Sequence, residues 1–325
     1  MGMRSVLWVV FAFLAGAIVV GLAGRYRGDV ECEGFRHINP DYACAERPVI
    51  RKTSYAELVA RINDLIEKES ASGTMSVASV YFRDLRGGPV WGINESINFA
   101  PASLLKLPLV MTLFSLNENI PGLIDTEITF EMARIERFEN LKQHELSGVR
   151  LEEGKKYRLQ ELARNAIVHS DNVSYYVLVD YFHTVVPEGV SFVTRTFQEL
   201  GVIAPRSLAE EVVTARVYAA LFRLLYNVSF LDARSSDTLL GWLADASFAK
   251  GLAAGVPEGT TVANKFGERD LPDGTQHLHD CGIVYYPDNP YLLCVMTKGR
   301  KWEELARVMG TISRMVWEEV DSRRQ

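Results

Sequence analysis

The sequence has little that would support a metal-dependent or nucleic-acid-binding function. Its 325 residues include four cysteines and six histidines, and none of them has the spacing of a metal-ligand motif. The net charge is −6, and the lysines and arginines are dispersed without a basic stripe, which argues against a nucleic-acid partner. No internal repeat occurs. What is present is an ordinary globular composition, 48% hydrophobic and 23% charged, which suits a substantial core.

One long apolar run stands at the start of the chain. Residues 5–24 carry no charge, which is long enough to cross a bilayer as a helix. The alternative is a cleaved signal peptide with a small-residue cleavage site at 21–23. We favour an uncleaved anchor because the run exceeds a usual signal segment. We therefore expect a transmembrane anchor or signal segment at 1–24, a linker at 25–53 and one extracytoplasmic domain at 54–325.

Hydrophobic periodicity predicts the order helix, two strands, a helical block, three strands and a helix. The strands are expected at 75–84, 89–93, 259–267, 277–286 and 291–297, and the terminal helices at 54–68 and 301–320. Helices within the block are expected at 103–117, 159–168, 173–182, 207–226 and 239–246. The simplest arrangement is an α+β fold with a five-stranded antiparallel sheet flanked by the terminal helices. An all-helical lobe at about 120–255 would complete a cleft between lobe and sheet.

The cysteines form two pairs by position. Cys32 and Cys44 follow the apolar run, and in an oxidising compartment they could bridge a short loop. Cys281 and Cys294 fall on the last two predicted strands. If residue 286 pairs with residue 291 across the turn, these two cysteines face the same side of the sheet, either as neighbours or as buried free thiols.

Ser103 and Lys106 carry the strongest chemical signal. They lie three residues apart in an otherwise apolar segment, so a helix would place them on one face about one turn apart. A serine hydroxyl needs a nearby base to act as a nucleophile. A lysine desolvated among leucine and proline side chains should have a lowered pKa. The alternative is an N-cap serine and a surface lysine at a helix edge.

Two further motifs follow in chain order. The three motifs are Ser103-x-x-Lys106, Ser170-Asp171-Asn172 and Lys265-Phe266-Gly267. Their joint occurrence resembles the class A β-lactamase and penicillin-binding protein superfamily, whose signatures are S-x-x-K, S-D-N and K-T-G. The resemblance covers about residues 55–319, including the strand–strand–helix ending. It implies an active site between the helical lobe and the sheet.

The resemblance also implies a role for each motif residue. Ser103 would attack a carbonyl carbon to form an acyl-enzyme, and Lys106 would hold the hydroxyl and take its proton. Ser170 would relay a proton to the leaving nitrogen. Asn172 would bind Lys106 or the substrate amide, and Lys265 would supply positive charge for a substrate carboxylate.

The remaining implied positions bind substrate or shape the site. The backbone N–H groups of Ser103 and Glu268 would form the oxyanion hole. Phe266 and Gly267 occupy the substrate-binding strand, and Asp171 would hold its loop by hydrogen bonds. This chemistry needs no metal and no organic cofactor.

The chain departs from the family pattern in two places. Phe266 replaces a threonine whose hydroxyl helps bind the substrate carboxylate, and its ring would instead line an apolar subsite. No Glu-x-x-Leu-Asn loop follows the second motif, so the base that activates the deacylating water is missing. Glu199, Glu210 and Glu211 are interpreted as solvated helix charges. His277 and His279 alternate on one strand, and a strand-surface position is expected for both.

These observations lead to a functional expectation with two alternatives. We expect a membrane-anchored serine hydrolase of the cell envelope that acts on, or is acylated by, β-lactam amides through Ser103. The first alternative is a D-alanyl peptidase or esterase acting on a cell-wall peptide or an ester. The second is a non-catalytic envelope binding protein with the same fold.

Overall fold

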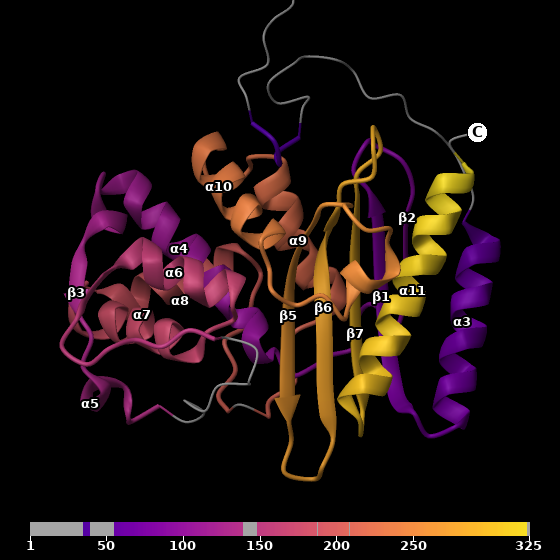
Figure 1. Ribbon diagram of the computed structural model, residues 1–325, viewed down its shortest axis with the longest axis horizontal. Helices are drawn as coiled ribbons and strands as arrows, with labels where there is room; N and C mark the ends of the chain where they lie inside the picture. The colour runs from indigo at the N-terminus through magenta and orange to yellow at the C-terminus, as the bar shows by residue number, and fades with distance from the viewer. Residues whose placement is uncertain (1–34, 40–54, 139–147, 187, 208, 324–325) are drawn as a thin grey trace, which may run out of the picture.

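The computed structural model describes residues 35–39, 55–138, 148–186, 188–207 and 209–323 (Figure 1). The predicted anchor and the pair Cys32 and Cys44 lie outside these residues. Within the described part of the chain, no helix is long and apolar enough to cross a membrane.

A five-stranded antiparallel sheet forms the centre of the molecule, as predicted. Its strands are β1 (Met75–Asp84), β2 (Val90–Ile93), β5 (Val262–Asp270), β6 (Gln276–Val284) and β7 (Tyr291–Gly299). Their order is β2-β1-β7-β6-β5, and every neighbouring pair is antiparallel. The N-terminal hairpin and the C-terminal strands thus join in one sheet, which places β5 at an edge.

The two terminal helices cover one face of this sheet (Figure 1). They are α3 (Ala56–Ala71) and α11 (Trp302–Ser322). Leu58 and Ile62 recur at helical spacing on α3, and Val308 and Ile312 do so on α11. All four are fully buried in one apolar cluster with side chains of the sheet. The period-3.6 pattern of both segments therefore produces the predicted layer.

The other face of the sheet carries the helical lobe (Figure 1). Its helices are α4 (Lys106–Asn119), α5 (Met132–Ile135), α6 (Leu159–Val168), α7 (Asn172–Thr184), α8 (Gly189–Glu199), α9 (Ala215–Tyr226) and α10 (Ala233–Ala244). Short 3₁₀ turns stand at η1 (Ala102–Leu105), η2 (Leu123–Asp125) and η3 (Leu252–Gly255). The lobe is not all-helical, because β3 (Glu127–Thr129) and β4 (Lys156–Arg158) pair within it.

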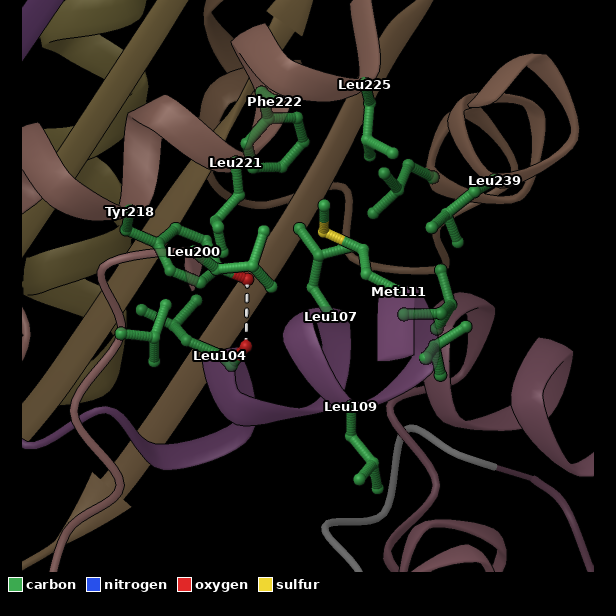
Figure 2. Packing of buried hydrophobic residues seen from close by; sticks show 14 of the residues in the cluster. Leu104, Leu107, Leu109, Met111, Leu200, Tyr218, Leu221, Phe222, Leu225 and Leu239 are labelled. Carbon is green, nitrogen blue, oxygen red and sulfur yellow. Dashed lines mark hydrogen bonds between the residues drawn. The ribbon is translucent and has the colours of Figure 1, made fainter. Parts of the chain in front are cut away.

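Helix α4 passes through the centre of the lobe. Its first nine residues, 106–114, are all buried, so it lacks the polar face of a surface helix. Figure 2 shows Leu107 and Met111 of this helix packed towards Leu225 and Leu239 from α9 and α10. Leu109 points away from that group, on the opposite side of α4. The helix therefore has apolar neighbours on more than one side.

The helix predicted at 207–226 begins later than expected. Thr214 caps α9, and its hydroxyl oxygen accepts a hydrogen bond from Val217 N at 3.2 Å. Just before the cap, Val213 exchanges backbone hydrogen bonds of 2.8 and 3.1 Å with Phe99. The segment is extended because its backbone groups bond to the chain that leads into Ser103, rather than to a helical turn.

The register of the last hairpin also differs from the prediction. Val284 pairs with Tyr291, so residue 286 lies beyond the ladder and the expected register is two residues off. The parity is unchanged, which leaves Cys281 and Cys294 on the same side. They are directly opposite each other and form a disulfide.

Part of the predicted linker packs on the domain. Ile38 is 5% exposed within the core of the helical lobe. Asn39 N donates a hydrogen bond of 2.7 Å to Tyr226 O, and Tyr285 Oη donates one of 2.8 Å to His37 O. Residues 35–39 therefore lie against α9 and the end of β6.

Candidate active site

Ser103 and Lys106 lie at the junction of η1 and α4, one turn apart. Lys106 Nζ is 2.9 Å from Ser103 Oγ, and the lysine is 2% exposed. Burial first, and then the charge of Lys265, hold the pKa of Lys106 well below its usual value. A neutral amine in contact with a hydroxyl is able to accept its proton.

The turn between α6 and α7 carries Ser170. Its φ of +54° lies in the left-handed region, which costs a non-glycine residue about 1 kcal/mol or more. Asp171 follows it and caps α7, with Oδ2 accepting a hydrogen bond of 2.6 Å from Ser174 N. This turn places Ser170 Oγ 3.2 Å from Lys106 Nζ and 2.9 Å from Lys265 Nζ.

The oxygen atoms around Lys106 define where its lone pair points. Lys106 Nζ donates to two acceptors that carry no proton, Ser170 O and Asn172 Oδ1, the latter at 2.7 Å. A neutral amine has two N–H groups, and these two acceptors use both. The lone pair then faces the hydroxyl groups, of which Ser103 Oγ is the nearer. This arrangement orients Lys106 to take the proton of Ser103.

Lys265 approaches the same serine turn from strand β5. Its side chain is fully buried, and burial lowers its pKa to about 7. Behind it lies Asp280, whose pKa burial raises to about 6. Asn264 Nδ2 donates a hydrogen bond of 2.8 Å to Asp280 Oδ1. The Asp280 carboxylate favours the charged form of Lys265, which partly opposes the effect of burial.

A glycine lets the sheet approach the turn that carries the nucleophile. A Cβ atom on Gly267 would lie 2.9 Å from Leu104 Cγ and 3.2 Å from both Leu104 N and Pro101 O. Strand β5 therefore runs directly against η1, and a side chain at this position would push the two apart. The N–H groups of Ser103 and Glu268 as an oxyanion hole remain a prediction.

The backbone around η1 is held from the lobe side as well. Tyr218 Oη on α9 donates a hydrogen bond of 3.0 Å to Leu104 O, drawn as the dashed line in Figure 2. Ala102 has a φ of +50°, so the residue before Ser103 is also in the left-handed region. The strained conformations of Ala102 and Ser170 persist because the surrounding contacts over-determine them.

The two histidines of β6 are not on the strand surface, which corrects the expectation. His277 and His279 are fully buried. Ala100 N donates a hydrogen bond of 3.3 Å to His277 Nδ1, and His279 Nε2 donates one of 3.0 Å to Ala100 O. Burial lowers their pKa values to about 4 and about 3. The alternating spacing was visible in the sequence, but their partner, the backbone of Ala100, was not.

Phe266 does not line a subsite, which corrects a second expectation. Its side chain is 2% exposed and stacks on Phe248, with ring centroids 4.4 Å apart. Neighbouring residues of a strand point to opposite faces. Phe266 packs in the cluster on the side of α11, and Lys265 Nζ lies 4.5 Å from the centroid of its ring. The residue that replaces the family threonine is therefore a core residue here.

The three glutamates considered as deacylating bases lie elsewhere. Glu199 is exposed at the end of α8. Glu210 and Glu211 precede α9 instead of lying on it. Glu211 forms an ion pair with Lys298, and its Oε1 lies 3.6 Å from His277 Nε2. None of the three lines the cavity beside Ser103.

A cavity of about 380 Å³ adjoins the nucleophile. Ser103, Lys106 and Asn172 line one part of it, and the rest extends into the lobe between α4, α7 and α8. Its walls include Leu109, Val179, Phe182, Val193 and Phe197. Arg269 of β5 also lines it, and the buried Nε of this arginine has no hydrogen-bond partner among the described residues. Sequence reasoning missed this cavity, although the apolar faces of the two helical segments were visible.

Among the residues that the structure describes, no group of three potential metal ligands occurs. The polar groups of the site are instead hydroxyls, amines and an amide. Such a set supports nucleophilic and acid–base chemistry.

Comparison with known proteins identifies solved structures with a similar fold. No curated protein sequence matches the chain significantly. The structure of PBP-A has a TM-score of 0.68 at 21% identity and covers 85% of this chain and 100% of its own. A class A β-lactamase from Bacteroides cellulosilyticus has a TM-score of 0.68 at 18% identity, covering 82% and 99%. The TLA-3 extended-spectrum β-lactamase has a TM-score of 0.69 at 18% identity, covering 80% and 98%.

The fold is thus that of the class A β-lactamases and of PBP-A. The sequence model of the β-lactamase enzyme family matches residues 57–320, and the chain belongs to that family.

Proposed function

We propose that this protein is a serine acyl-transfer hydrolase whose Ser103 is acylated by β-lactam amides. The observation that carries the proposal is the orientation of Lys106. In its neutral form, Lys106 would use its two N–H groups on the two acceptors without protons, which directs its lone pair at Ser103 Oγ, 2.9 Å away.

The same geometry supports the steps that follow. Ser103 Oγ bonds to the carbonyl carbon of the lactam while its proton moves to Lys106. The C–N bond breaks, and the Ser170 hydroxyl, held between two amines, passes a proton to the leaving nitrogen. Lys265, in its charged form, attracts the substrate carboxylate. A mutant of PBP-A has been crystallised as an acyl-enzyme with penicillin G, which makes that compound the natural first probe.

Time-resolved intact-mass measurement with penicillin G tests the proposal. The expected result is a mass increase of one intact penicillin on the wild-type protein, located on Ser103 by peptide mapping. Ser103→Ala should show no adduct. Ser115→Ala removes a hydroxyl from the same helix outside the cavity and serves as the matched control. The proposal would be contradicted if the folded wild-type protein formed no adduct with any of several β-lactams.

A second candidate, a D-alanyl peptidase or esterase, is favoured by the wall of the cavity. None of the described residues lining it is an aspartate or glutamate, so no carboxylate there can activate a water. A β-lactam adduct should then persist, while a D-Ala-D-Ala peptide or an ester is turned over. Rapid adduct loss together with no turnover of either alternative substrate would exclude this candidate.

The location of the protein is a further part of the proposal. The uncharged run at 5–24 supports an anchored, extracytoplasmic domain. Alkaline extraction of membranes tests the anchor, because an integral segment resists it. The intact mass of the released protein distinguishes an uncleaved anchor from a processed signal segment.

A further inference from the structure

The cavity beside Ser103 extends well past the reacting groups. It starts at the nucleophile and runs between α4, α7 and α8. Leu109 lines it from α4, on the side of that helix opposite Leu107 and Met111 (Figure 2). The contributions of α7 and α8 include Val179, Phe182 and Val193. A space of about 380 Å³ is within the range of cavities that enclose small ligands.

The chemistry of the wall argues against a water channel. Apart from the reacting groups, most of the residues that line it are aliphatic or aromatic. Apolar cavities stay dry and take up apolar guests, whereas ordered water needs two or more polar partners. Polar groups in the rest of the wall come from a few side chains, among them His183, Thr194 and Arg269, and the larger part of the wall is apolar. Burial of an apolar chain there would be favourable.

We propose that this cavity receives the apolar acyl chain of an ester substrate whose carbonyl carbon is attacked by Ser103. The inference rests on the proposed nucleophilic role of Ser103 and names the substrate class. Ser103 Oγ bonds to the acyl carbon, and the bond from that carbon to the ester oxygen breaks. The serine proton passes through Lys106 and Ser170 to the leaving alkoxide. Water then releases the carboxylic acid and restores the hydroxyl.

The volume of the cavity limits the length of the acyl chain that it can hold. A methylene group occupies about as much volume as one water molecule, roughly 30 Å³. A volume of about 380 Å³ then holds an unbranched chain of at most about twelve carbons. Each methylene moved from water into the cavity should raise kcat/KM about fourfold, until the space is filled.

The experiment uses p-nitrophenyl esters of unbranched acids from acetate to hexadecanoate, below their micelle concentrations. The full-length wild-type protein should show kcat/KM rising with chain length to between about eight and twelve carbons and then falling. Val179→Trp adds bulk to the cavity wall from α7, and Val193→Phe adds bulk from α8. Each should lower the ratio of octanoate to acetate rates by tenfold or more. Gln198→Phe adds an aromatic ring to α8 outside the cavity and should keep the wild-type ratio.

Three outcomes separate this inference from the proposed function. Equal rates on acetate and octanoate, with adducts still formed on Ser103, would overturn the acyl-chain cavity and leave the nucleophile intact. The acyl-chain cavity would also be overturned if both cavity variants kept the wild-type ratio of octanoate to acetate rates while unfolding at the wild-type temperature. Failure of every ester and every β-lactam to modify Ser103 would overturn both proposals.

Discussion

At the scale of single residues, the proposed mechanism gives two buried lysines of one site different tasks. Lys106 must be neutral to take a proton, and burial together with the charge of Lys265 favours that form. Lys265 must be charged to attract a carboxylate, and Asp280 behind it favours that form. The chain places one lysine among three oxygen-bearing neighbours and the other beside a buried carboxyl group. Their environments thus separate a base from an electrostatic anchor.

This separation predicts the pH dependence of acylation. Loss of charge on Lys265, whose pKa is about 7, should reduce the acylation rate by penicillin G as the pH rises through 7. The carboxylate-free ester p-nitrophenyl acetate should lack this decline, because it has no charge for Lys265 to attract. Second-order acylation rates between pH 5 and 9 would measure both profiles. An identical decline with both substrates would contradict the role of Lys265 as carboxylate anchor.

Gly267 gives a second prediction at this scale. In Gly267→Ala the new Cβ would meet Leu104 Cγ at 2.9 Å and backbone atoms at 3.2 Å, so η1 must shift. We expect a loss of roughly 1–3 kcal/mol in the free energy of unfolding and at least a tenfold slower acylation of Ser103. Gly310→Ala on α11 is the matched control, since its nearest neighbour would be 3.4 Å away. Urea unfolding and penicillin acylation measure both effects, and equal behaviour of the two variants would contradict the close-approach argument.

At the scale of secondary structure, hydrophobic periodicity predicted the elements correctly where one face of a segment is buried. It located β1 at 75–84 and α6 at 159–168 with the observed bounds. It failed for 207–214, where the backbone of Val213 pairs with Phe99. That pairing depends on a contact more than a hundred residues away, so no local pattern reports it. The small sheet of β3 and β4 was missed because three-residue strands have no measurable period.

The candidate site, like the secondary structure, was predicted from the sequence only in part. Ser103, Lys106, Ser170 and Lys265, which the resemblance singled out in the sequence, are joined by hydrogen bonds in the structure. The orientation of Phe266 was wrong, since strand alternation sends it to the opposite face from Lys265. The cavity walls and the Ala100 contacts were missed, because each is assembled from elements that are distant in sequence.

His277 and His279 link β6 to Ala100, in the segment before η1, which predicts an acid-sensitive stability. Both pKa values are lowered, to about 4 and about 3. The folded state therefore binds fewer protons than the unfolded state between about pH 3 and 6.5. Stability from these histidines is lost as the pH falls through that window. Asp280, with its pKa raised to about 6, opposes part of this trend between pH 6 and 4.

Two substitutions of His279 distinguish the effect of its charge on stability from the effect of its hydrogen bond. His279→Gln keeps a donor for Ala100 O but does not titrate, so its free energy of unfolding should fall less between pH 6 and 4 than that of the wild type. His279→Ala leaves the buried carbonyl without its donor and should lose about 1–3 kcal/mol at pH 7. Urea unfolding at pH 7, 6, 5 and 4 gives both quantities. If the free energy of unfolding of His279→Gln falls more steeply between pH 6 and 4 than that of the wild type, a group other than His279 causes the loss of stability in acid.

At the scale of the whole molecule, the site lies between the helical lobe and strand β5 of the sheet. One apolar core joins the sheet to α3 and α11, and another joins it to the helical lobe. The lobe supplies Ser103, Lys106 and the serine turn, while the sheet supplies Lys265 and Gly267. The hydrogen bond from Lys265 Nζ to Ser170 Oγ crosses between them. The relative placement of lobe and sheet therefore sets the distances within the site.

The segment at 35–39 contributes to the lobe core from outside the predicted domain, which began at 54. Ile38 is 5% exposed among side chains of the lobe core, so Ile38→Ala removes three buried carbons and leaves a cavity. We expect the free energy of unfolding to fall by about 2–4 kcal/mol. Ile120→Ala makes the same deletion at a residue that is 51% exposed and should cost about 0.5 kcal/mol or less. Urea unfolding of both variants measures the difference. A loss at Ile38 no larger than that at Ile120 would place the start of the folded domain at 54, whereas the expected loss extends it to residue 35.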